Sequence, residues 1–253
     1  MSSTLRRIRW IGLGAVLCVM GGAASAAEIK LVASNAVKEA YGQLLPAFEK
    51  ASGNTVTVSW GGTADIMKRI GGGEIADVVI ITDFGIETLT KQGKLIAAGR
   101  ANVAKSAVGA AVREGTPKPD ISSGDALKKS LLAVKAIVLT PGPGNPYLHE
   151  LFDKMGIGSE MKAKEVYPAA GQQLTDPLIA GTADIVFSQA SELIAVKGIA
   201  YAGPLPPGAQ IVLTYTAGFH AAAPQPQAAK ALVNFLTTPE AVKLLKKNGL
   251  EPG

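Results

Sequence analysis

Cysteine and histidine are scarce in this chain of 253 residues. The single cysteine is Cys18, close to the N-terminus, and the two histidines are His149 and His220. With so few thiolate and imidazole ligands, we expect no metal site, and no disulfide can stabilise the chain beyond residue 26. Stability is expected to come from burial, because a chain of this length buries about 70% of its unfolded surface. We also expect no cofactor.

Clusters of a single charge are also missing. The formal net charge of +5 falls to +2 without residues 1–26, because they hold three of the 25 Lys and Arg residues and none of the 20 acidic ones. The other basic residues stand singly or in pairs such as Lys128-Lys129, which is typical of solvated helix surfaces. We therefore expect no nucleic-acid partner.

Several motifs of nucleotide binding and hydrolysis are absent. The sequence contains no Gly-x-Gly-x-x-Gly, no Gly-Lys-Ser/Thr, no Gly-x-Ser-x-Gly and no His-Glu-x-x-His. Nucleotide binding and the common hydrolase mechanisms are not supported, and spacing marks no catalytic residue.

The N-terminus has the features of a secretory signal peptide. Three arginines in the first nine residues precede an apolar run from Trp10 to Ala24 and the small residues Ala24-Ser25-Ala26. A membrane anchor is the alternative, but a spanning helix needs roughly 20 apolar residues. Lipidation of Cys18 is disfavoured because Leu17 stands where a small residue is required. We predict cleavage after residue 26 and a periplasmic location.

Apolar β-branched runs alternate with segments of helical period along the rest of the chain, which is typical of the α/β class with mixed sheets flanked by helices. The predicted strands are residues 29–32, 55–59, 77–82, 108–112, 136–139, 184–187 and 211–219. The predicted helices are residues 36–51, 64–70, 147–155, 173–179, 225–236 and 239–247. The length favours two lobes, with residues 27–106 and 217–253 in lobe 1 and residues 107–216 in lobe 2.

Three turns place small polar residues between a predicted strand and a predicted helix. These turns are Ser34-Asn35-Ala36, Gly61-Gly62-Thr63-Ala64 and Pro143-Gly144-Asn145-Pro146-Tyr147. Ligands bind at the carboxyl ends of strands in open α/β sheets, where helix starts offer free N–H groups to anions. Ser34, Asn35 and Thr63 are candidate donors, although each residue type is also a common N-cap. Gly144 either lets the backbone approach a ligand or supplies a positive φ.

Between residues 27 and 253 the chain resembles the periplasmic molybdate-binding proteins of ABC transporters, which have a type II solute-binding fold. The resemblance rests on Ala64–Ile70 leading into Ala76–Ile80, on Asp184–Phe187 and on the ending from Ala241 to Gly249. It implies two lobes that are joined by crossover strands and close on an oxyanion.

The resemblance also implies ligand positions. Thr63 falls where that family has a ligand-binding serine, and the second serine falls on Ala36 or, with a shift, on Asn35 or Ser34. The ligand tyrosine of the family falls on Phe187, which has no hydroxyl. Two further stretches, 112–122 and 187–193, resemble a divergent branch that includes generic extracellular solute-binding proteins and the periplasmic aconitate isomerase.

Our leading hypothesis is a monomeric solute-binding protein that delivers a small oxyanion, molybdate-like or an organic carboxylate, to an ABC permease. The expected ligand-binding residues are Ser34, Asn35, Thr63, Gly144 and Asn145, together with Gln172, Gln173 and Gln189 from the second lobe.

The alternative is an isomerase that moves the double bond of an unsaturated tricarboxylate such as aconitate. This reaction needs a positioned base, and the candidate proton carriers are His149, Tyr147 and Glu39. A third class, an adhesion or scaffolding protein, has little support because the glycines and polar turns follow a ligand-site pattern.

Overall fold

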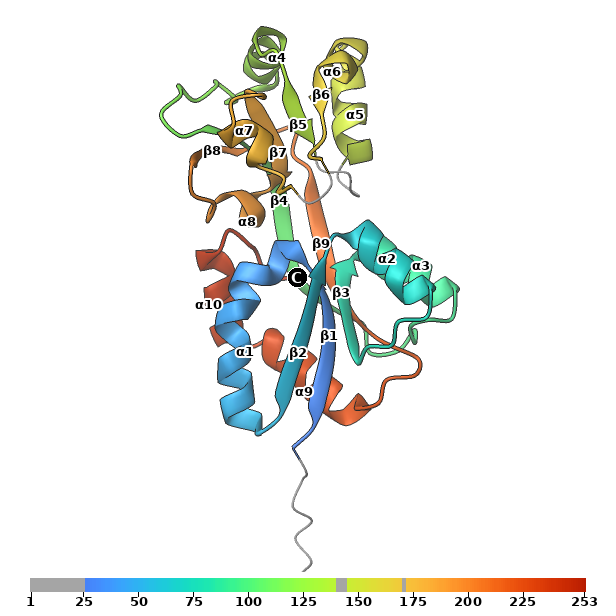
Figure 1. Cartoon of the computed structure of the whole chain (residues 1–253). Helices are drawn as coiled ribbons and strands as arrows, with labels where there is room; N and C mark the ends of the chain where they lie inside the picture. Colours follow the sequence, from blue (N-terminus) through green and yellow to red (C-terminus); the bar gives the residue numbers. More distant parts are fainter. Residues whose placement is uncertain (1–25, 140–144, 170–171) are drawn as a thin grey trace, which may run out of the picture.

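The computed structural model describes residues 26–139, 145–169 and 172–253, and these form a two-lobe α/β fold (Figure 1). Gly144 and nearly all of the predicted signal peptide lie outside these residues. The strands are β1 (Glu28–Ser34), β2 (Thr55–Gly61), β3 (Val78–Thr82), β4 (Ala101–Arg113), β5 (Ile137–Leu139), β6 (Glu165–Val166), β7 (Ile185–Gln189), β8 (Ile199–Pro204) and β9 (Val212–Phe219). They form a mixed sheet in the order β2-β1-β3-β9-β4-β7-β5-β6, with β8 paired to β4.

Helices flank both faces of this sheet. They are the 3-10 helix η1 (Asn35–Val37) and the α-helices α1 (Lys38–Ser52), α2 (Thr63–Gly71), α3 (Asp83–Lys91), α4 (Gly124–Ala133), α5 (Asn145–Lys154), α6 (Gly158–Lys164), α7 (Asp176–Ile179), α8 (Ala190–Leu193), α9 (Pro226–Leu236) and α10 (Pro239–Lys247). Across the described ranges, none of them combines the length and the apolar composition needed to span a membrane.

Two long strands connect the lobes. β4 pairs with β9 through residues 101–107 and then continues into pairs with β7 and β8. Lobe 1 holds β1, β2 and β3 with η1, α1, α2, α3, α9 and α10, whereas lobe 2 holds β5 to β8 with α4 to α8 (Figure 1). The exact boundaries assigned from the sequence stay a prediction.

Lobe 1 is a sheet with a helical layer on each face. Side chains alternate along β3, so that Val78 and Ile80 belong to the core under α1, α9 and α10, while Val79 and Ile81 belong to the core under α2 and α3. All five residues of β3 are buried, which agrees with its uninterrupted apolar sequence. β1 pairs in parallel with both β2 and β3, so the carboxyl ends of these three strands lie at one edge of the lobe.

Lobe 2 repeats this arrangement with shorter strands. Ile185 and Phe187 of β7 pack in the core that α4, α5 and α6 cover, and Val186 faces the core that contains residues of α7 and α8. β5 is parallel to both β6 and β7, so the ends of these three strands also lie at one edge.

Several predicted elements match closely, and others are wrong. The last helix was predicted with its observed bounds. α1 ends at Ser52, and the next residue, Gly53, has a φ of 73°, which suits glycine. The helix predicted at 173–179 begins only at Asp176, and the strand predicted at 108–112 is the later part of a strand that begins at Ala101. α3 was missed because it starts directly after β3 with no turn residue between them.

Candidate functional site

The carboxyl ends of the lobe 1 strands hold three of the sequence-predicted donors. Ser34 ends β1, is buried, and its Oγ accepts a hydrogen bond from the Ala36 N–H at 3.3 Å, as an N-cap does. Asn35 follows as an exposed residue of η1. Thr63 is also buried, but it is the first residue of α2, whose N-cap is Gly62. The N-cap interpretation therefore holds for Ser34 and is wrong for Thr63.

The starts of α2 and α3 lie close together. Gly85 in the first turn of α3 has no side chain, and a Cβ there would lie 3.1 Å from Thr63 Cγ2 and 2.6 Å from Ile81 Cδ1. Glycine thus permits the approach of the two helix starts. Neither N-cap residue, Gly62 or Thr82, caps its helix with a side-chain hydrogen bond. In the first turn of α3 the Phe84 N–H donates to Asp83 Oδ1 at 2.8 Å, so the start of α2 is the better site for an anion.

Three buried side-chain oxygens near strand ends and helix starts have no hydrogen-bond partner among the described residues. They are Thr82 Oγ1 at the end of β3, Gln189 Oε1 at the end of β7 and Asn145 Oδ1 at the start of α5. A buried polar atom without a partner costs free energy, and such atoms in a native structure are explained by a ligand, water or a functional role. Both lobes therefore contribute unpaired polar atoms.

The other predicted donors of lobe 2 are engaged locally. Gln172 is exposed, and its Oε1 accepts a hydrogen bond from the Ala169 N–H at 2.8 Å. Gln173 is exposed too, and its backbone N–H donates to Asp176 Oδ2 at 2.8 Å. Neither side chain is positioned by a buried contact, so Asn145 and Gln189 are the stronger candidates from this lobe.

The three proton carriers considered for an isomerase do not form one cluster. Glu39 lies exposed in the first turn of α1 in lobe 1, whereas Tyr147 and His149 lie exposed on α5 in lobe 2. His149 Nε2 lies 2.7 Å from Glu165 Oε1. The remaining histidine, His220, is buried, and its Nδ1 accepts a hydrogen bond from the Ala222 N–H.

Sequence reasoning missed a titratable cluster where the lobes meet. Glu192 of α8 accepts hydrogen bonds from Ser188 Oγ at 2.5 Å and from the Gln189 N–H. Its helix packs against η1, the segment that follows Ser34. Burial raises the pKa of Glu192, although both hydrogen bonds act in the opposite direction. A glutamate three residues after a helix N-cap is a capping signal that the sequence does contain.

Tyr215 of β9 links this cluster to lobe 1. Burial raises the pKa of its hydroxyl well above the ordinary value, the charge of Glu192 raises it further, and a hydrogen bond from Ser34 lowers it. A chain of polar groups therefore runs from Ser34 through Tyr215 toward Glu192 and crosses from one lobe to the other.

A second network, on the surface of lobe 2, was also missed. The side chain of Glu165 lies 8% exposed and contacts both His149 and Tyr167. Tyr167 follows β6, so it lies at the same sheet edge as Asn145, with which it shares a hydrogen bond. Nothing in the local sequence around Tyr167 distinguishes it from an ordinary loop aromatic.

Phe187 does not face the other lobe. Its side chain is 1% exposed and packs against Phe152, with ring centroids 6.2 Å apart and the rings tilted by 65°. A hydroxyl at this position would lie in the lobe 2 core. The polar residues at this strand end are instead Ser188 and Gln189.

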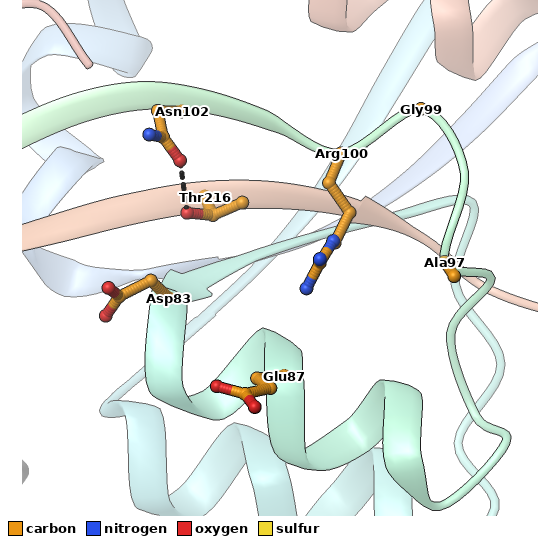
Figure 2. Close-up of a pocket in the computed structure, with 7 residues that line it drawn as sticks. All are labelled: Asp83, Glu87, Ala97, Gly99, Arg100, Asn102 and Thr216. Atoms are coloured by element: carbon orange, nitrogen blue, oxygen red, sulfur yellow. Dashed lines mark hydrogen bonds between the residues drawn. The ribbon is translucent and has the colours of Figure 1, made fainter.

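A separate cavity of about 560 Å³ adjoins α3 in lobe 1 (Figure 2). Its lining residues are Asp83, Glu87, Ala97, Gly99, Arg100, Asn102 and Thr216. The Thr216 hydroxyl donates to Asn102 Oδ1 at 2.8 Å, and Figure 2 shows the side chain of Arg100 extending toward α3, which carries both carboxylates. Two carboxylates against one guanidinium make this cavity unfavourable for an anion. In the described ranges, no group of three His, Cys, Asp or Glu side chains could hold a metal ion.

Comparisons with known proteins show the family and the fold of the chain. A curated aconitate isomerase from Pseudomonas sp is 30% identical over 256 residues, which covers 97% of each chain. The periplasmic molybdate-binding protein of Azotobacter vinelandii superposes with a TM-score of 0.74 at 19% identity, over 89% of this chain and 99% of that one. The sulfate-binding protein of Mycobacterium tuberculosis H37Rv gives a TM-score of 0.72 at 24% identity, over 89% and 87%. The family model for bacterial extracellular solute-binding proteins matches residues 29–251, and the chain belongs to that family.

Proposed function

We propose that this protein captures a small anion between its two lobes and delivers it to an ABC permease. The anion is either an inorganic oxyanion or an organic carboxylate. The residues of the protein that bind the anion lie at the strand ends and helix starts of each lobe that face the other lobe.

The observation that carries this proposal is the set of unpaired groups at the facing lobe edges. Lobe 1 offers the start of α2, which no side chain caps, and the unpaired hydroxyl of Thr82, which can donate to an anion. Lobe 2 offers the side-chain amides of Asn145 and Gln189, whose unpaired oxygens accept a hydrogen bond from a donor on the ligand. Helix starts carry a partial positive charge, so their N–H groups bind anions without a lysine or arginine. Neutral donors suit a carrier because the ligand must also leave.

The relatives support the same interpretation. The molybdate-binding and sulfate-binding proteins that share this fold are named for tetrahedral oxyanions. Capture requires only that the ligand binds a closed arrangement of the lobes better than an open one. β4 and β9, the two strands that connect the lobes, provide the hinge for such a change.

Export and partnership are part of the proposal. A periplasmic location follows from the predicted signal peptide and is typical of extracellular solute-binding proteins, and we propose a monomer. N-terminal sequencing of the protein from a periplasmic fraction should begin at Ala27, and light scattering should give the mass of one chain. An uncleaved N-terminus or a dimer mass would contradict these two points.

The test is a thermal-shift panel with molybdate, tungstate, sulfate, phosphate, dicarboxylates, tricarboxylates and both aconitate isomers. A ligand at 100 times its dissociation constant adds about 2.7 kcal/mol to the free energy of unfolding, which is readily measured as a rise in Tm. We expect a saturable rise with at least one anion. No rise with any of them would contradict anion capture.

Isomerisation of an unsaturated tricarboxylate is the second candidate. The aconitate isomerase relative and the buried carboxyl of Glu192 beside Tyr215 support it. In this reaction a proton leaves the carbon beside a carboxylate, the electron pair shifts through the double bond, and a proton returns two carbons away. No oxidant or reductant is required, but a base with a pKa near the working pH is.

Conversion of trans-aconitate to cis-aconitate by the purified protein tests this candidate. If it is correct, Glu192→Gln should abolish conversion while trans-aconitate still raises the Tm. If the unmodified protein binds trans-aconitate without converting it, isomerisation is contradicted and anion carriage is the function that remains.

A further inference from the structure

Four side chains of lobe 2 form a connected hydrogen-bond network that ends at a candidate ligand-binding residue. His149 Nε2 lies 2.7 Å from Glu165 Oε1, and the Tyr167 hydroxyl donates to Glu165 Oε2 at 2.7 Å. Asn145 contacts the Tyr167 hydroxyl from the other side. The network joins α5 to the end of β6, and its central carboxylate is almost completely buried.

The chemistry of these groups fixes the direction of every hydrogen bond. A carboxylate only accepts, so the single proton of Tyr167 must point to Glu165. The Tyr167 oxygen is then an acceptor for Asn145, and an amide can fill that role only with its Nδ2. Asn145 Oδ1 must therefore face away from Tyr167, where it is buried and has no partner among the described residues.

Asn145 itself stands at the edge of lobe 2 that faces lobe 1, because it is the first residue of α5. α5 begins at Asn145, at the end of lobe 2 nearest to lobe 1 (Figure 1). Gln189 Oε1, the other unpaired amide oxygen, ends β7, which is parallel to β5. A fully deprotonated oxyanion has only lone pairs to present to a carbonyl oxygen and is repelled by it. A hydroxyl or an acid proton on the ligand would satisfy it.

We infer that Asn145, oriented by Glu165 through Tyr167, selects anions that also carry a hydrogen-bond donor, such as hydroxy acids or protonated oxyanions. This inference rests on the proposed function, because it concerns the same site. Sites that hydrogen-bond a hydroxyl of the ligand discriminate strongly against analogues that lack it, since the buried group is then left unpaired. Asn145 supplies specificity, and Glu165 and Tyr167 are positioning residues.

Matched pairs of anions test this selectivity by isothermal titration calorimetry. Malate and succinate differ by one hydroxyl, as do citrate and propane-1,2,3-tricarboxylate, and hydrogen phosphate differs from sulfate by one proton. In each pair that binds, we expect the member with the donor to bind at least tenfold more tightly. Equal or tighter binding of the donor-free member would overturn the inference. If no anion binds at all, the proposed function fails instead.

Glu165→Gln provides the sharper test because it permits the network to reverse. The new amide can donate to the Tyr167 oxygen, so that the Tyr167 proton turns to Asn145 Oδ1 and Asn145 Nδ2 faces away. We expect the preference within a pair to fall at least tenfold or to invert. Unchanged preference in both a folded Glu165→Gln protein and a folded Tyr167→Phe protein, which has no hydroxyl to pass the orientation on, would overturn the inference.

Two further variants separate positioning from general damage. Tyr167→Phe breaks the network without changing charge and should also reduce the preference, so it replaces Glu165→Gln if that variant does not fold. Glu150→Gln makes the same charge change one residue after His149, on an exposed side chain that forms an ion pair with Lys154. It should leave the preference and the Tm unchanged.

Discussion

The two lobes face each other with different chemistry. Lobe 1 presents mainly donors, namely the first-turn N–H groups of α2 and the hydroxyls of Thr63 and Thr82, and α2 begins close to α3 at Gly85. Lobe 2 presents amide oxygens, and the oxygen of Asn145 is held in one orientation by a buried carboxylate. Charge attraction and ligand discrimination therefore need not come from the same surface, because lobe 1 suits any anion whereas lobe 2 distinguishes among anions.

Phe187→Tyr tests whether the core of lobe 2 can supply a hydroxyl as lobe 1 does. The new hydroxyl would lie in the core beside Phe152 without a partner, so we expect a loss of about 1–3 kcal/mol in the free energy of unfolding and no gain in anion affinity. Chemical denaturation measures the loss. Phe84→Tyr, at a position 62% exposed, is the control for stability and should leave the free energy of unfolding unchanged. A tighter anion complex with unchanged stability would contradict the placement of Phe187.

Gly85→Ala tests whether lobe 1 depends on the close approach of its helix starts. The added Cβ meets Ile81 and Thr63, and the overpacking cost exceeds the gain of about 1 kcal/mol in helix propensity. We expect a net loss of about 1 kcal/mol and a several-fold weaker anion complex, measured by denaturation and calorimetry. Gly42→Ala, where nothing lies within 4 Å of the added Cβ, should instead be neutral or stabilising. Similar behaviour of the two variants would argue against the packing role.

Glu192→Gln tests the polar cluster where the lobes meet, through the pH dependence of the Tm. We expect it to have the smallest effect of these changes. Because burial raises the pKa of Glu192 in the folded protein, its neutral form is favoured there. Its contribution to stability is complete at a pH below the ordinary pKa of a glutamate and is lost as the pH rises through the raised value. The unmodified protein should therefore lose Tm relative to Glu192→Gln between pH 4 and pH 8. A constant difference across this range would contradict a raised pKa.

The fold could be predicted from the sequence because its signals are local. The buried β3, the helix stop at Gly53 and the last helix follow from apolar runs, glycine and proline in a short window. The candidate site was only partly predictable. Ser34 and Thr63 stand in recognisable turns, but Glu192 and Tyr215 lie 23 positions apart in the sequence, on α8 and β9, and the charge of one acts on the other only in the folded protein.

The orientation of Asn145 shows the same limit. The residue could be selected from its turn, but the direction of its amide depends on Tyr167 and Glu165, which are 22 and 20 positions away in the sequence, in and just after β6. Likewise, alignment with a ligand tyrosine could not reveal that Phe187 faces the core. Hydrogen-bond direction is a property of the folded network.

The central claim, an anion held between the lobes, is tested most directly by calorimetry on one variant from each lobe. Thr63→Val removes a hydroxyl from lobe 1 at nearly constant volume, and Gln189→Met removes the amide from lobe 2. With the anion that stabilises the unmodified protein, both variants should bind at least tenfold more weakly, a change of about 1.4 kcal/mol. If either variant binds with full affinity while the other does not, the ligand is held by one lobe alone and the account is contradicted.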